Sequence, residues 1–258
     1  MPLIVGTSGW QYRDWRGVLY PEGLPQRAWL ERFAEEFPAV EVNNAFYRLP
    51  ERAVFERWRE QTPAGFVVAV KVSRYLTHIK RLRDPAEPVA RLTGRAEGLG
   101  ERLGPYLLQL PPTLRVAPEL LDACLACFPR GTRVAVEPRH ESWWTDEVRD
   151  VLVRRRAALT WADRLGRPAT PLWATADWGY LRMHQGTASP RPSYGRTALA
   201  TWLHRIDAAW PRAATATAPD VFVFFNNDPG GAAVGNARTL CRMAGNRGLA
   251  VATAPGPA

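Results

Sequence analysis

The stretch Val68-Ala69-Val70-Lys71-Val72 decides the fold class, because a lysine stands in it among alternating valines. Successive side chains of a β-strand point to opposite faces, so the valines share one face and Lys71 follows Ala69 on the other. Strands of a β-barrel turn every second residue toward the barrel axis. We therefore predict a barrel strand whose valines face outward and whose lysine lies inside.

Similar β-rich runs recur along the 258-residue chain, separated by segments of helical periodicity. This alternation is typical of βα units around a parallel sheet, and the chain length fits one (β/α)8 TIM barrel. The predicted strands are residues 3–7, 39–43, 66–72, 106–110, 133–137, 158–162, 179–184 and 220–226. The predicted helices are residues 25–37, 51–61, 85–101, 117–128, 145–156, 197–210 and 230–245.

The domain organisation follows from the same pattern. Residues 164–177 hold two prolines and no helical periodicity, so we expect a loop in place of the helix after the sixth strand. We assign residues 1–251 to a single α/β barrel domain and residues 252–258 to a flexible C-terminal tail. Residues 213–219 are expected to form a flexible loop.

Composition limits the classes of protein and partner. A hydrophobic content of 46% with 23% charged residues argues against a disordered chain. The sequence contains no run of 18 apolar residues, so no membrane span is predicted. Three cysteines are too few for a disulfide framework, and the amino terminus leads straight into a strand, so we expect a cytoplasmic protein. The net charge of +9 favours anionic partners, with nucleic acid among them. The sequence makes no prediction of oligomeric state.

Lysine usage gives a second, independent signal. The chain has 34 basic residues of which only Lys71 and Lys80 are lysines, and both lie within residues 70–81. Lysine is a compact donor whose pKa moves on burial, whereas arginine keeps its charge and presents a planar fork. We expect Lys71 to need an ammonium inside the barrel and Lys80 to be a rim group in the third βα loop. Coding bias with chance clustering is the alternative.

Strand alternation places polar side chains at the inner face of nearly every strand end. They are Ser8, Glu41, Asn43, Lys71, Gln109, Glu137, Arg139, Asp163, Arg182, His184 and Asn226. The carboxyl ends of barrel strands form the active-site face, so this is the predicted site. Any single member can simply satisfy a buried neighbour, but burying several ions together is costly, and polar residues gathered at one end fit a site better than a filler.

These residues belong to ordered motifs. The motifs are Gly6-Thr7-Ser8-Gly9-Trp10, Glu41-Val42-Asn43 with Phe46-Tyr47-Arg48, Lys71-x-x-Arg74-Tyr75-x-Thr77-His78-x-Lys80-Arg81, Gln109-Leu110-Pro111-Pro112, Glu137-x-Arg139-His140-x-Ser142-Trp143, Tyr180-x-Arg182-x-His184 and Phe224-Phe225-Asn226-Asn227-Asp228. Together they resemble the YecE-like family, catalogued as domain of unknown function seventy-two. The resemblance implies a (β/α)8 barrel and no established reaction. Gln185 departs from the family pattern, in which His-Gly is more often direct.

The first functional hypothesis is an enzyme, of hydrolase, lyase or isomerase type, acting on an anionic and typically phosphorylated small molecule. Arginines clamp anions through paired hydrogen bonds, and carboxylates with a lysine supply acid and base groups. The predicted catalytic residues are Glu41, Lys71, Glu137 and His184. The predicted substrate-binding residues are Ser8, Trp10, Asn43, Tyr47, Arg48, Arg74, Tyr75, His78, Lys80, Gln109, Arg139, His140, Trp143, Arg182, Asn226 and Asp228.

Several of these residues have a plain structural alternative. Arg48 and Arg74 can be surface groups, and His140 can cap or orient a loop. Lys71 is a candidate for imine chemistry only if its pKa is lowered. Because Glu41 and Glu137 on other strands are expected to raise that pKa, we favour Lys71 as an electrostatic stabiliser or acid rather than an amine nucleophile.

The second hypothesis is a nucleic-acid-binding or phosphodiester-cleaving protein resembling endonuclease IV-type barrels. Rim aromatics interleaved with arginines suit base stacking with backbone neutralisation. The aromatics are Trp10, Tyr12, Trp15, Phe46, Tyr47, Tyr75, Trp143 and Trp144. A metal cluster of Glu41, Glu137, Asp163, His184 and Asp228 is the less favoured version, because cations in the same ring oppose a divalent metal, and no cofactor or metal ligand is predicted. The third hypothesis is ligand binding without catalysis.

Overall fold

Parallel strands form the centre of the fold and are listed here in chain order. They are β1 (Pro2–Ser8), β2 (Ala39–Val42), β3 (Val67–Lys71), β4 (Leu103–Gln109), β5 (Val134–Glu137), β6 (Ala158–Leu159), β7 (Trp161–Arg164), β8 (Arg167–Pro168), β9 (Gly179–Met183), β10 (Val221–Phe225) and β11 (Ala250–Val251). The computed structural model describes residues 2–211 and 220–256. Within it, the strands pair in the order β6-β5-β4-β3-β2-β1-β10-β9-β7-β8, and β11 pairs with β1.

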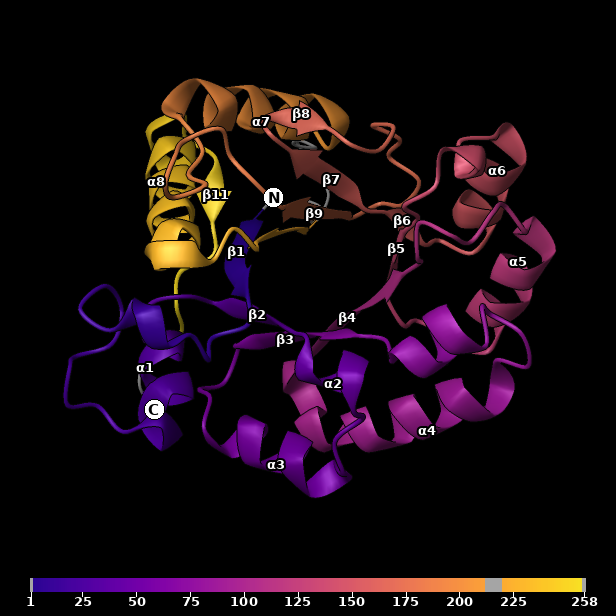
Figure 1. Cartoon of the computed structure of the whole chain (residues 1–258), viewed down its shortest axis with the longest axis horizontal. Helices are drawn as coiled ribbons and strands as arrows, with labels where there is room; N and C mark the ends of the chain where they lie inside the picture. The colour runs from indigo at the N-terminus through magenta and orange to yellow at the C-terminus, as the bar shows by residue number, and fades with distance from the viewer. Residues whose placement is uncertain (1, 212–219, 257–258) are drawn as a thin grey trace.

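The sheet curls into a barrel-like ring, with helices around its outside (Figure 1). All described pairings are parallel except that of β8 with β7. At the two ends of the path, β6 pairs with β5 while β7 pairs with β9, and only Thr160 separates β6 from β7. The predicted single α/β domain with a mostly parallel sheet is confirmed.

Helices cover the outer face of the sheet, except for the four-residue helix Asn44–Tyr47, whose Phe46 ring lies over the inward-facing Lys71. They are α1 (Trp29–Ala34), α2 (Asn44–Tyr47), α3 (Arg52–Glu60), α4 (Ala86–Ala96), α5 (Pro118–Ala126), α6 (Asp146–Arg154), α7 (Arg196–Ala209) and α8 (Ala232–Asn246). Every predicted helix is present, and Thr145 begins α6 by accepting a hydrogen bond from the Val148 amide. No helix lies between β7 and β9 in the described chain, which confirms the predicted loop. The sequence did not reveal α2 or the short π-helix η3 (Tyr75–Ile79), because each is too short to show periodicity.

Two hydrophobic layers follow from the strand alternation. Val68 and Val70 belong to the large outer core under the helices, as predicted. The base of the interior is filled by a separate cluster that combines small side chains, such as Ala39, Ala69 and Ala135, with the rings of Tyr180 and Phe224. Apolar residues therefore fill the amino-terminal part of the interior and leave the polar groups at its carboxyl end.

The sixth strand corrects the predicted facing of Asp163. Ala158 belongs to the inner cluster and Ala162 lines the inner pocket, whereas Trp161 packs outward against Trp210 at 4.6 Å between ring centroids. Asp163 shares the outward face of Trp161 and accepts hydrogen bonds from Tyr194 Oη and Trp202 Nε1, both at 2.7 Å. The prediction that Asp163 points inward is therefore wrong.

The ends of the described chain bear on three further expectations. The predicted flexible loop at 213–219 lies outside the described residues, as do the last two residues of the predicted tail. Residues 252–256 have no regular secondary structure, and the Ala252 amide donates to the Leu3 carbonyl. None of the helices described is both long enough and apolar enough to pass through a membrane.

Candidate functional site

A buried ion triad lies at the carboxyl ends of the strands. Arg182 on β9 donates from Nη2 to Glu41 Oε1 at 2.9 Å and from Nη1 to Glu137 Oε2 at 2.7 Å. All three side chains are almost completely shielded from water. Arg182 thus bridges two carboxylates on β2 and β5 across the barrel interior, and this bridge holds both carboxylates in fixed positions.

Further donors complete the coordination of each carboxylate. Glu41 also accepts hydrogen bonds from Ser8 Oγ and Tyr180 Oη, both at 2.7 Å. Burial alone would raise the pKa of Glu41, but Arg182 and these two hydroxyls lower it below its ordinary value. Glu41 is therefore a fixed anion near neutral pH and a poor proton donor.

Glu137 is still more strongly paired. It accepts from Gln109 Nε2 at 3.1 Å, from Arg139 Nε at 3.3 Å and from His184 Nε2 at 3.0 Å, besides Arg182. Burial opposes ionisation, but Arg182, His184 and Arg139 hold the pKa of Glu137 well below its ordinary value. The pairing of Glu41 and Glu137 does not support the acid role predicted for them.

Lys71 has a different environment from that expected. Its side chain is 8% exposed, makes no ion pair or hydrogen bond with the described residues, and holds Nζ 4.0 Å from the centre of the Phe46 ring. Burial, followed by the charge of Arg182, lowers the pKa of Lys71 to about 8 and outweighs Glu41 and Glu137. Glu41 and Glu137 do raise the pKa of Lys71, as expected, but burial and then the charge of Arg182 lower it by more, so the net direction is opposite to the one predicted.

His184 is held on both sides of its ring. Because Glu137 is ionised, the hydrogen bond between them is donated by His184 Nε2. On the other side of the ring, Asn226 Nδ2 lies 2.7 Å from Nδ1, which accepts when the ring is neutral. His184 therefore orients the Glu137 carboxylate and presents no free nitrogen for proton transfer.

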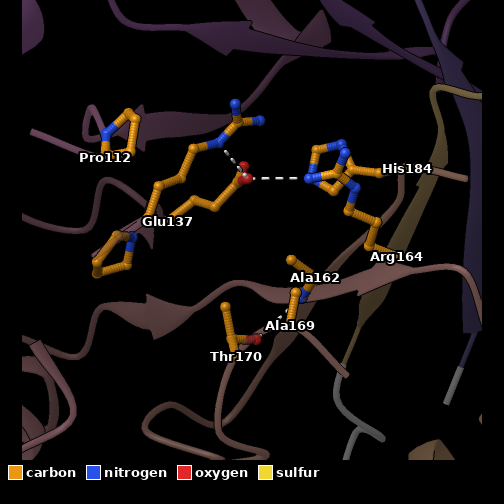
Figure 2. A pocket seen from close by; sticks show the side chains of 9 residues that line it. Pro112, Glu137, Ala162, Arg164, Ala169, Thr170 and His184 are labelled. Atoms are coloured by element: carbon orange, nitrogen blue, oxygen red, sulfur yellow. Dashed lines mark hydrogen bonds and ion pairs between the residues drawn. The ribbon is translucent and has the colours of Figure 1, made fainter. Parts of the chain in front are cut away.

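A pocket of about 460 Å³ opens beside Glu137 and His184, as Figure 2 shows. Its walls come from β5 and β7 and from the segments that follow β4, β5, β8 and β9, and include the arginines Arg139 and Arg164. Arg164 makes no ion pair within residues 2–211 and 220–256. The sequence prediction missed Arg164, although the alternation that turns Ala162 inward also turns Arg164 toward the pocket, where it is exposed to solvent.

Cations gather around the same mouth on the β3 side. His78 lies in η3, with its ring 5.0 Å from that of Phe46. Burial lowers the pKa of His78, and Lys71, Arg74 and Arg139 lower it further. These three cations are therefore close enough to act on one imidazole, so Lys71 and the pocket residue Arg139 share one electropositive region.

Other predicted binding residues lie on the outer rim. Arg48 and Arg74 are exposed, Tyr47 is 73% exposed and Tyr75 is partly exposed. Lys80 is paired with Asp84 at 3.2 Å, which supports its separation from Lys71. Asn43 follows β2 next to α2.

Half of the aromatic residues of the predicted rim are buried, namely Trp10, Trp15, Phe46 and Trp143. Trp10 packs edge-on against Trp58 at 5.5 Å, and Trp143 donates from Nε1 to the Leu114 carbonyl inside the core. Both are almost fully buried, so the prediction of a rim position is wrong for them. His140 accepts from the Ser142 amide and begins a short helical turn, which is the capping alternative.

Asp228 is a further group whose pKa is shifted toward neutral pH. It follows β10, and burial, assisted by the negative charges of Glu41 and Asp14, raises its pKa to about 7. The side chains predicted as a metal cluster do not gather: in the described part of the chain no three His, Cys, Asp or Glu residues are placed to hold a metal. Asp163, one proposed member, faces the outer helices.

Comparison with known proteins agrees with the resemblance predicted from the motifs. The model of the family described as "Protein of unknown function DUF72" matches residues 4–258. The UPF0759 protein YunF of Bacillus subtilis is 23% identical in an alignment 276 residues long, and the alignment covers 93% of this chain and 94% of YunF. The UPF0759 protein YecE of Escherichia coli is 32% identical over 145 residues, which cover 55% of this chain and 50% of YecE.

Solved structures show the same fold. A DUF72 family protein from Thermotoga maritima superposes with a TM-score of 0.79 at 28% identity, over 94% of this chain and 99% of the other. A second DUF72 family protein, from Enterococcus faecalis, gives a TM-score of 0.78 at 18% identity over 99% of both chains. The second likeness supports the fold alone.

Proposed function

This chain belongs to the DUF72 family of proteins of unknown function, and we propose from its site that it binds a small anionic molecule and transforms it with the help of Lys71. The anion lies between Arg139 and Arg164. The triad of Glu41, Arg182 and Glu137 provides fixed charges beneath it and takes no part in proton transfer. A phosphorylated or carboxylated metabolite is the class of ligand that best fits paired guanidinium groups.

The proposal treats residues 158–164 as one barrel strand. Since β6 and β7 are separated only by Thr160 and pair with β5 and β9 respectively, the sheet is interpreted as a closed (β/α)8 barrel extending over residues 1–251. In such barrels the carboxyl ends of the strands carry the chemistry. The pocket beside Glu137 lies at that end.

One observation carries the proposal: a pocket of ligand size has two arginines in its wall, and Arg164 is unpaired among the described residues. Small-molecule pockets typically measure about 300–1,000 Å³. An unpaired guanidinium in a concave site attracts an anion more strongly than one exposed on a convex surface, because the surrounding protein lowers the effective dielectric.

Lys71 is the group best suited to proton transfer. An amine with a pKa of about 8 exists in both protonation states near neutrality, whereas Glu41 and Glu137 stay ionised. We therefore propose that Glu41 and Glu137 are positioning residues rather than catalytic residues, and that His184 fixes Glu137. Hydrolase, lyase and isomerase chemistry all remain compatible with a lysine acid or base.

Thermal unfolding with added ligands tests the anion site. Inorganic phosphate, sugar phosphates and small carboxylates are added at millimolar concentration, and a ligand at about 100 times its Kd should raise Tm by about 5 °C or more. Arg164→Ala should abolish the shift. Arg167→Ala on β8 is the matched control, because Arg167 is exposed and does not line the pocket. Equal responses of the two variants, or no stabilising anion for the unaltered chain, would contradict the proposal.

The nucleic-acid alternative has less support. Several aromatics expected to stack bases lie in the core, and part of the basic charge on the outer helices is neutralised, since Arg154 and Arg155 pair with Asp122. Binding of single-stranded DNA that weakens steeply with salt and is lost in Arg164→Ala would favour this alternative. Stabilisation by a small anion without its conversion would favour ligand binding alone.

A further inference from the structure

We propose that Lys71 forms an imine with the carbonyl carbon of an anionic aldehyde or ketone, whose charged group lies between Arg139 and Arg164. This inference rests on the proposed function, because the anion site orients the carbonyl compound. It narrows the substrate class from anions in general to anionic carbonyl compounds, and the reaction class to lyase or isomerase.

The amine of Lys71 has no hydrogen-bonding or ion-pair partner among the described residues. Lys71 makes no ion pair or hydrogen bond with residues 2–211 and 220–256, although Glu41 lies on the adjacent strand β2 and Glu137 lies on β5, one strand beyond β4. Arg182 occupies both of those carboxylates. A buried lysine used for structure is normally paired, so an unpaired one at the strand ends points to a reactive role.

The surroundings of Lys71 also favour the neutral amine. The face of the Phe46 ring, 4.0 Å from Nζ, attracts the ammonium, but burial and then the cations Arg182 and Arg139 oppose a third positive charge. The anions Glu41 and Glu137 act in the opposite direction but less strongly, and His78 lies on the other side of Phe46. Burial together with neighbouring cations is a physical means of activating an amine as a nucleophile.

The amine of Lys71 must also be able to reach a ligand in the pocket. Lys71 is not part of the pocket wall, but it pairs with Leu107 on β4, and Gln109 on the same strand donates a hydrogen bond to Glu137, which lines the pocket. The four-carbon stem of Lys71 carries the amine on a flexible arm. An anion held between Arg139 and Arg164 would lie beside Glu137, which is a member of the triad.

The step balances within the site. The neutral amine of Lys71 attacks the carbonyl carbon, a C–N bond forms, and the carbonyl oxygen takes up a proton to give a carbinolamine. The C–O bond then breaks, and water leaves. The net change from ammonium and carbonyl to protonated imine and one water needs no oxidant or reductant. The positive imine withdraws electrons from the neighbouring carbon, which permits cleavage or proton transfer there.

Borohydride trapping tests the step on the full-length chain. The protein is incubated at pH 7.5 with glyoxylate, pyruvate or dihydroxyacetone phosphate, treated with sodium borohydride, and digested for peptide mass spectrometry. The chain contains only Lys71 and Lys80 as lysines, so Lys80 is an internal control that needs no variant to fold. We expect at least about tenfold more adduct on Lys71, because an amine with a pKa of about 8 is about one quarter neutral at this pH.

Adduct on Lys71 that does not exceed adduct on Lys80 with any of the three compounds would overturn the inference. A neutral carbonyl, acetaldehyde, separates this failure from failure of the anion site. If Arg164→Ala lowers labelling by glyoxylate at least about tenfold but leaves labelling by acetaldehyde unchanged, both proposals hold. If Lys71 reacts preferentially with both reagents and Arg164→Ala has no effect, the imine stands and the anion site fails. If anions stabilise the fold without preferential labelling of Lys71, only the imine fails.

Discussion

Lys71→Met should make the stability of this protein less dependent on pH. The pKa of Lys71 is about 8 in the folded chain against an ordinary 10.5, and this difference of about 2.5 corresponds to about 3 kcal/mol below pH 8. The unfolded chain binds the proton more tightly than the folded chain. Stability is therefore lowest below pH 8 and rises as pH increases toward 10.5. Methionine has a similar length and removes the charge.

The magnitude can be compared between two pH values. At pH 7 nearly the whole cost of about 3 kcal/mol applies, while at pH 9.5 about 1.4 kcal/mol remains. The unaltered protein should therefore gain about 2 kcal/mol relative to Lys71→Met between these pH values. Urea unfolding, followed by tryptophan fluorescence at both pH values, measures the free energy of unfolding of each protein. Taking the difference between two proteins cancels the titration of all other groups.

Lys80→Met is the matched control. Lys80 lies near the surface beside Asp84, and its replacement by methionine removes the same charge from the chain without touching the buried triad or Phe46. Should Lys71→Met keep the same pH dependence as the unaltered protein, the burial argument for Lys71 is refuted. The absolute stability of Lys71→Met at one pH is a weaker measure, because the contact with Phe46 also changes.

Three further variants test other parts of the site by urea unfolding. Arg182→Met should destabilise the fold by about 3–5 kcal/mol, because it leaves Glu41 and Glu137 buried without their shared cation; a loss below about 1 kcal/mol would show that the triad is not buried as described. Asp228→Asn should stabilise the protein at pH 8 by up to about 4 kcal/mol, and the gain should disappear toward pH 4. The reason is that the pKa of the Asp228 carboxyl is raised from 3.8 to about 7, so the unaltered protein loses stability as pH rises between those values. A gain independent of pH would contradict this cause. Trp202→Phe should cost about 1.5–3 kcal/mol through loss of the hydrogen bond to Asp163, and the same cost in a protein already carrying Asp163→Asn would show that the bond is not responsible.

Strand alternation predicted most of the inner polar layer correctly. Glu41, Lys71, Gln109, Glu137 and Arg182 are all buried, because apolar neighbours in each strand mark the outer face. The sixth strand failed, because alanine and threonine fit either face. Trp161 and Leu159 mark the outer face there, and giving them more weight would have placed Asp163 outside and turned Arg164 toward the pocket.

The partners of each charge could not be predicted from the sequence. Whether Lys71 or Arg182 pairs with the glutamates depends on side-chain length and direction across the interior. The lowered pKa of Lys71 comes first from its burial and then from the charge of Arg182, and neither could be weighed from the sequence. Rim aromatics were equally ambiguous, because a tryptophan following a strand can cover the mouth or fold back into the core. Trp10 and Trp143 fold back.

Asp163 has a consequence for ligand selectivity. It is fixed by Trp202 on α7 and by Tyr194 in the loop after β9, and it directly precedes Arg164 in the chain. The position of a pocket arginine is therefore set by side chains on the outside of the barrel. In the proposed anion site, substitutions on α7 would alter which anions fit while every group proposed to contact the anion stays the same, so the selectivity of that site would evolve at a distance from it.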